Sequence, residues 1–103
     1  MNTVEYLDAA KAVLRIESDY ALAKAMEMRP STISNYRAGR SQMDDEIAMK
    51  VARIIKKEPG LVMLDMHIER SKTPELRAAL TGFMEKISAS FIDLLSGAKP
   101  HAA

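Results

Sequence analysis

The chain has 103 residues, which is enough for one small domain with a short extension. Hydrophobic residues make up 48% of it and aromatic residues only 5%, so we expect aliphatic and methionine side chains to pack between helices. The net charge of +1 excludes a strongly basic tail and an acidic disordered chain, and the lack of cysteine excludes disulfides and thiolate metal sites. No apolar run reaches membrane-spanning length and no signal peptide is seen, so we expect a cytoplasmic protein without a membrane partner.

Glycine, proline and helix-capping residues divide the chain into six segments with helical periodicity. The first segment begins at Asn2, which is spaced to form a capping box with Glu5. The next two begin at Ser18, a good N-cap, and at Pro30, which suits a first helical position. The acids at 44–46 begin a fourth helix, where negative charge is favourable. The sequence therefore predicts an all-α fold.

Two further helices are predicted in the second half of the chain. One runs from about Pro59 to Ser71, with Leu61, Leu64 and Ile68 in one row and Val62 and Met66 beside them. Thr73 caps the other, which is the longest of the six. The apolar residues of this last helix follow helical spacing and form one stripe, made of Leu76, Leu80, Phe83, Ile87, Phe91 and Leu94.

The stretch from Ser18 to Gly39 predicts two short helices joined by a tight turn. Small Ala23 beside Leu22 allows the second helix to approach the first closely. No acid occurs between Pro30 and Gln42, and from Lys24 to Arg40 four basic residues against the one acid Glu27 give a local charge of +3. The basic residues are Lys24, Arg29, Arg37 and Arg40. Positive charge concentrated on one helical hairpin is typical of nucleic-acid binding.

The segments Asp19–Met26 and Ser31–Arg40 resemble the helix-turn-helix of Cro/C1-type phage repressors and bacterial regulators. The likeness lies in the Leu-Ala pair of the first segment and in the Ser-Thr-Ile-Ser run, the aromatic residue and the Gly-Arg ending of the second. It extends over roughly residues 3–57, and Glu27 departs from the glycine usual in the turn. The resemblance implies a lambda repressor-like bundle that binds double-stranded DNA in a sequence-specific way.

The resemblance also implies a role for each outward residue of the second helix, about residues 30–38, which would enter the major groove. Residues in its first turns would read base edges, and asparagine can pair with adenine. The base-reading residues are then Pro30, Ser31, Ser34 and Asn35. The phosphate-binding residues are Arg29, Thr32, Arg37, Gly39 and Arg40. Arg37 also suits the negative end of a helix dipole without any DNA contact.

The sequence predicts no enzyme. It contains no nucleotide-binding loop, no HExxH motif and no pair of residues that could serve as nucleophile and base. His67 has no second histidine within helical reach, so we expect a surface histidine rather than a metal ligand. Neither a metal nor another cofactor is expected.

The chain is expected to divide into a DNA-binding domain at 1–58, a dimerisation extension at 59–97 and a frayed tail at 98–103. The apolar stripe of the last helix either completes the core of the monomer or pairs with a second copy. Because DNA half-sites lie about one helical turn apart, two linked copies bind better than one, and we favour a homodimer with the stripe as its interface.

Two functions are compatible with this pattern. The first is a dimeric transcriptional repressor of the phage or mobile-element type, which binds an inverted-repeat operator and is controlled by its concentration or by a regulatory protein partner. The second is a helical protein-interaction module, antitoxin-like or anti-repressor-like, that binds another protein through the apolar stripe.

Overall fold

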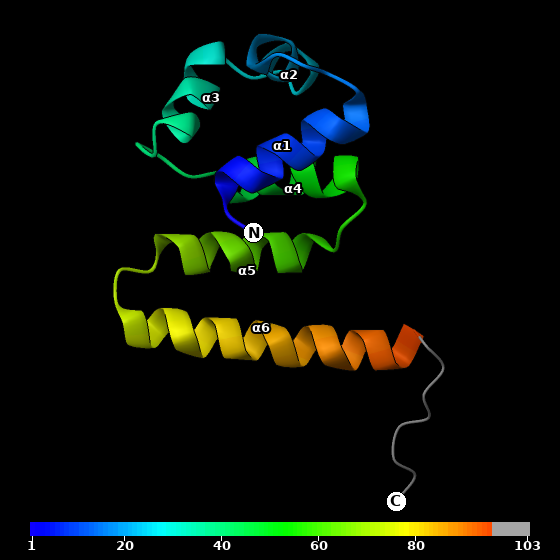
Figure 1. The fold of residues 1–103 in the computed structure, drawn as a ribbon, viewed down its shortest axis with the longest axis vertical. Helices are drawn as coiled ribbons and strands as arrows, with labels where there is room; N and C mark the ends of the chain where they lie inside the picture. Colours follow the sequence, from blue (N-terminus) through cyan, green and yellow to red (C-terminus); the bar gives the residue numbers. More distant parts are fainter. Residues whose placement is uncertain (96–103) are drawn as a thin grey trace, which may run out of the picture. The chain divides into compact units, whose positions relative to one another are not determined.

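The computed structural model describes residues 1–95, apart from the side chains of Phe91, Leu94 and Leu95, and the expected tail at 98–103 lies outside the described residues. Residues 1–95 form helices and no strand, which confirms the all-α prediction (Figure 1). The helices are α1 (Thr3–Leu14), α2 (Asp19–Ala25), α3 (Pro30–Arg37), α4 (Asp45–Ile55), α5 (Pro59–Arg70) and α6 (Pro74–Leu95). None of these helices is both long and apolar enough to cross a membrane.

Local capping interactions explain where the helices begin. The Asn2 side chain accepts a hydrogen bond from the Glu5 N–H, and the Glu5 carboxylate accepts one from the Asn2 N–H, which confirms the capping box. Ser18 caps α2 by accepting from the Ala21 N–H. Asp44 caps α4 in the same way, so the acidic run at 44–46 acts on the helix end as expected.

The chain forms two compact units, unit 1 from Met1 to Arg70 and unit 2 from Ser71 onward. In unit 1, α1 packs against α4, α4 against α5, and α2 against α3. The largest fully buried side chains of this unit are Tyr6, Leu7, Leu22, Ile33, Met43, Met66, Val51, Val62 and Thr3. Unit 1 thus ends at Arg70 and includes α5, whereas the sequence places the end of the DNA-binding domain at residue 58.

Of the apolar residues that the sequence places in one row of α5 and beside it, the structure buries those beside the row. Val62, Asp65 and Met66 are buried, whereas the predicted row of Leu61, Leu64 and Ile68 is only half-buried. The predicted row contains the larger aliphatic side chains, but Val62 and Met66 belong to the cluster formed with α1 and α4. The packing of α5 against α4 therefore decides its orientation more than its own apolar periodicity.

A buried polar cluster ties α5 to α1. The Tyr6 hydroxyl donates a hydrogen bond to the Asp65 carboxylate, and Lys57 Nζ donates to the Tyr6 hydroxyl oxygen at 3.1 Å. Lys57 Nζ also lies 3.8 Å from Asp65 Oδ2. Beside this cluster, Thr3 Oγ1 donates to Glu69 Oε1 at 2.7 Å. Burial, and then the hydrogen bond to Asp65, raise the pKa of Tyr6 above its ordinary value.

Candidate nucleic-acid interface

Helices α2 and α3 form a pair joined by a short turn in which Glu27 adopts the left-handed conformation, with φ at 56°. The chain reverses there because the Met28 N–H bonds to the Ala23 carbonyl at 2.8 Å. Leu22 of α2 and Ile33 of α3 are fully buried in the shared core. The turn therefore forms without the glycine that the resemblance would place at Glu27.

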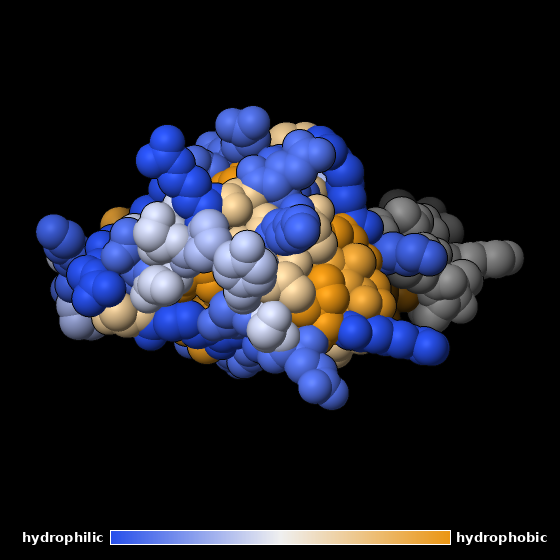
Figure 2. Space-filling model, turned by 90° about the horizontal axis from the view of Figure 1, so that it is seen from above, coloured by the Kyte–Doolittle hydropathy of each residue, from blue (hydrophilic) through white to orange (hydrophobic). Residues whose placement is uncertain are grey.

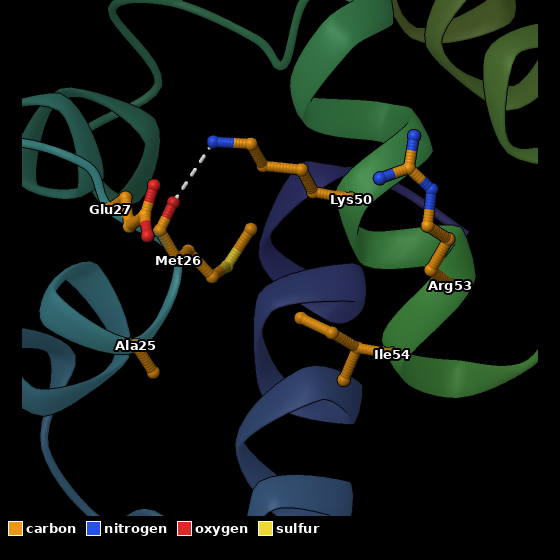
Figure 3. A pocket seen from close by; sticks show the side chains of 6 residues that line it. All are labelled: Ala25, Met26, Glu27, Lys50, Arg53 and Ile54. Carbon is orange, nitrogen blue, oxygen red and sulfur yellow. Dashed lines mark hydrogen bonds between the residues drawn. The ribbon is translucent and has the colours of Figure 1, made fainter.

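A shallow pocket of about 250 Å³ lies beside this turn, between the C-terminal end of α2 and helix α4. Figure 3 shows Lys50 of α4 reaching across to the Met26 carbonyl, to which its Nζ donates at 3.1 Å. Glu27 and Arg53 also line the pocket. The Lys50 bond satisfies a carbonyl at the end of α2, so this cation holds α4 against the turn.

The outward face of α3 carries small polar side chains and no acid. Pro30, Ser31 and Ser34 are exposed, and Asn35 is half-buried. The opposite face of α3 carries the buried Ile33 and Tyr36. Figure 2 looks onto the end of unit 1 that carries α2 and α3, and much of this surface is hydrophilic. The structure thus brings the four predicted base-reading residues together on one accessible helix, and their contact with bases stays a prediction.

The chain turns back sharply at the end of α3. Gly39 has φ at +74°, a conformation that glycine adopts without strain, and the Arg40 N–H returns to the Asn35 carbonyl at 3.0 Å. The Arg40 side chain bonds to the same residue as its backbone, since its Nε donates to Asn35 Oδ1 at 3.0 Å. A predicted phosphate-binding residue and a predicted base-reading residue are therefore joined directly.

Arg37 is held inside a network of charged side chains. Its Nε and Nη2 donate to the two carboxylate oxygens of Asp19 at 3.0 and 2.9 Å, and its Nη1 lies 2.8 Å from Asp8 Oδ1. Lys11 Nζ donates to Asp19 Oδ1 at 3.1 Å. The hydrogen bond from Arg37 lowers the pKa of Asp19, and the same bond raises the pKa of Arg37. In this arrangement Arg37 joins α3 to α1 and α2.

The other predicted phosphate-binding residues differ in accessibility. Arg29 is exposed and directly precedes α3, and its side chain makes no capping bond. Gly39 and Arg40 are exposed, whereas Thr32 is half-buried. The sequence pattern does not point to Asp8 or Lys11, because they lie on α1, outside the motif, and only the fold brings Asp8 to Arg37 and Lys11 to Asp19. The contact of these residues with phosphate stays a prediction.

Helix α6 carries the residues that the sequence assigns to a dimer interface. Leu76 is 49% exposed, Phe83 56% and Ile87 37%, and Leu80 is half-buried. The side chains of Phe91 and Leu94, also assigned to the interface, lie outside the described residues. Large apolar side chains therefore remain open to solvent along α6, which is what an interface requires.

No protein-family model matches the chain, and no solved structure matches it. Uncharacterized protein Gp-c of Pseudoalteromonas phage PM2 is 32% identical to it over 81 residues. The match covers 76% of this chain and 88% of the phage protein. A likeness that spans most of both chains goes beyond a shared short motif, and the chain belongs to the same family as Gp-c of phage PM2.

Proposed function

We propose that the chain is a sequence-specific DNA-binding regulator with a lambda repressor-like helix-turn-helix, formed by α2 and α3. The observation that carries the proposal is the outward face of α3, which presents Ser31, Ser34 and Asn35 between the exposed cations Arg29 and Arg40. A helix with small polar residues outward and cations at both ends fits the major groove, where the side chains reach base edges and the cations meet phosphates.

The proposal includes a homodimer formed through α6, acting as a repressor of the phage or mobile-element type. Phe83 and Ile87 lie one turn apart, and both are exposed. Burying apolar side chains of this size against a second copy is favourable by about 25 cal/mol for each Å² removed from water. In such a dimer, the α3 helices of the two copies would bind an inverted repeat with half-sites about 10 base pairs apart.

A second candidate function rests on the same exposed residues of α6. In an antitoxin-like or anti-repressor-like protein, Leu76, Phe83 and Ile87 would contact a different protein rather than a second copy. Such a module requires no interaction of α3 with DNA. The two functions are therefore separated by substitutions on α3 and not by substitutions on α6.

The experiment that tests the proposal is a selection of bound duplexes from a random library, with the full chain at about 0.15 M salt. We expect an enriched inverted repeat. Binding to the selected duplex is then measured at several salt concentrations for Arg29→Gln, which removes one exposed cation beside α3. This variant should weaken binding to all duplexes and reduce the salt dependence by about one unit of log–log slope.

The control is Arg53→Gln, which removes an arginine of α4 that is also exposed and lies outside the α2–α3 pair. It should leave the salt dependence nearly unchanged. No enrichment from the library, together with identical binding by both variants, would contradict DNA recognition through α3 and favour the protein-interaction module.

A further inference from the structure

The outward face of α3 has few side chains long enough to reach into a groove. Ser31, Ser34 and Ala38 are exposed on this face, and each has at most one heavy atom beyond Cβ. Residues spaced by three and four along a helix share a face, which adds Asn35 to this set. Short side chains allow the helix backbone to approach the bases closely. They leave Asn35 as the longest polar side chain of the outward face within α3.

Arg40 adds a second long polar side chain to this face, because two hydrogen bonds hold it beside Asn35. Its backbone N–H bonds to the Asn35 carbonyl, and its Nε donates to Asn35 Oδ1, both at 3.0 Å. Gly39 permits this return through its φ of +74°. The Arg40 side chain is exposed, so its terminal nitrogens remain accessible.

The chemistry of this bond fixes which way the Asn35 amide points. A guanidinium group has only donors, so the amide must present its oxygen and not its nitrogen to Arg40. The Asn35 Nδ2 group is then turned away from Arg40, with its two N–H donors available. The recognition pair, Asn35 with Arg40, therefore offers mainly hydrogen-bond donors.

From this geometry we infer that the recognition pair selects guanine in the major groove, an inference that rests on the DNA-binding function proposed above. Guanine presents two acceptors there, N7 and O6, which match a group that offers donors. Adenine presents one acceptor and one donor, and in a bidentate contact its donor would have to share the Asn35 amide oxygen that already accepts from Arg40 Nε. Arg40 thereby becomes a specificity-determining residue rather than a phosphate contact alone.

The test compares the duplexes selected by the wild-type chain with those selected by two variants. Arg40→Met keeps the length of the side chain but has no hydrogen-bond donor, so it loses both the bond to Asn35 Oδ1 and the donors offered to guanine. Asn35→Asp keeps the shape of the side chain and replaces its donor with an acceptor. In the wild type we expect one guanine in each half-site, and replacing it with adenine should weaken binding by about 10-fold to 100-fold. Both variants should reduce this preference at the same base position.

The control is Arg53→Met, which makes the same change at an exposed arginine of α4 that makes no bond to Asn35. It should keep the guanine preference. Far-ultraviolet circular dichroism of each variant verifies that the fold is retained, which is expected because Arg40 is exposed and Asn35 only half-buried.

The outcomes separate this inference from the function on which it rests. A selected site with adenine at the position sensitive to Asn35, or a guanine preference that persists in Arg40→Met, would overturn the inference and leave DNA recognition standing. A library selection without any enrichment would contradict the proposed function itself, and the guanine assignment would fall with it.

Discussion

Unit 1 buries its large apolar side chains, whereas helix α6 leaves several of its own exposed. In unit 1, Leu22 and Ile33 are fully buried, and the polar groups of Tyr6 and Asp65 bond to each other inside the structure. In α6, Phe83 is 56% exposed. Burial of apolar surface is the main favourable term in folding, so unit 1 has its own source of stability. The apolar residues of α6 provide comparable stabilisation only when another surface covers them.

The largest expected effect comes from a pair of identical substitutions in the two regions. Leu22→Ala leaves a cavity in the core of unit 1 and should lower its free energy of unfolding by about 2–5 kcal/mol. Leu76→Ala, at a side chain that is 49% exposed, should change it by less than about 0.5 kcal/mol. Urea unfolding followed by tyrosine emission measures both, because Tyr6, Tyr20 and Tyr36 all lie in unit 1. Equal losses would remove the distinction between the two regions.

The second prediction concerns the exposed stripe of α6. Phe83→Asp places a charge in the proposed dimer interface, where burial without a partner is unfavourable, so the mass in light scattering should fall by half. Thr81→Asp introduces the same charge on the far side of α6 and should leave the mass unchanged. Unit 1 should unfold at the same urea concentration in both variants. A dimer that persists in Phe83→Asp would refute this interface.

The third prediction uses the buried tyrosine of unit 1. The pKa of Tyr6 is raised, so the unfolded chain releases this proton near pH 10 while the folded chain still holds it. Stability from this group is fully present below pH of about 10 and is lost as the pH rises further. Tyr6→Phe should cost about 1–3 kcal/mol at pH 7 through the lost bond to Asp65, and this cost should shrink above pH of about 10.

Urea midpoints from circular dichroism at pH of about 7 and about 10.5 would measure the alkaline effect. Tyr20→Phe, at a side chain that is 67% exposed, is the control and should keep the wild-type dependence on pH. A residual slope should remain in Tyr6→Phe, because burial also raises the pKa of Tyr36. An unchanged alkaline slope in Tyr6→Phe would contradict the assignment to Tyr6.

The sequence predicts best those features of the fold that depend on neighbouring residues. The capping box of Asn2 with Glu5 and the cap at Ser18 both follow from a few adjacent residues, and the structure confirms them. The buried face of α5 was not predictable in the same way. It is set by contact with α4, which buries Val62 and leaves Leu61 half-buried.

The same distinction applies to the candidate interface. Sequence spacing places Ser31, Ser34 and Asn35 on one face of a helix, since helical geometry alone decides this. It does not reveal that Asp19 and Asp8 engage Arg37, because the Asp8 contact joins side chains 29 positions apart in the chain. Contacts between distant positions need the tertiary structure. This is why the two arginines that look alike in the sequence, Arg37 and Arg40, have different partners.

The smallest expected effect comes from opposite changes at two backbone positions. Glu27 adopts φ at 56°, which strains a residue with a side chain, so Glu27→Gly should raise the free energy of unfolding of unit 1 by about 0.5–1 kcal/mol. Gly82 lies within α6, and a Cβ added there meets no atom within 4 Å. Gly82→Ala should stabilise α6 by a similar amount, about 0.5–1 kcal/mol, because alanine loses less backbone entropy in a helix.

Tyrosine emission during urea unfolding should register Glu27→Gly, whereas Gly82→Ala should change only the helical signal in circular dichroism. Glycine also has more freedom in the unfolded chain, and the expected gain is the strain released at Glu27 less that entropic cost. A loss of stability in Glu27→Gly would show that the contacts across this turn, including Met28 N–H to the Ala23 carbonyl, hold Glu27 with little strain.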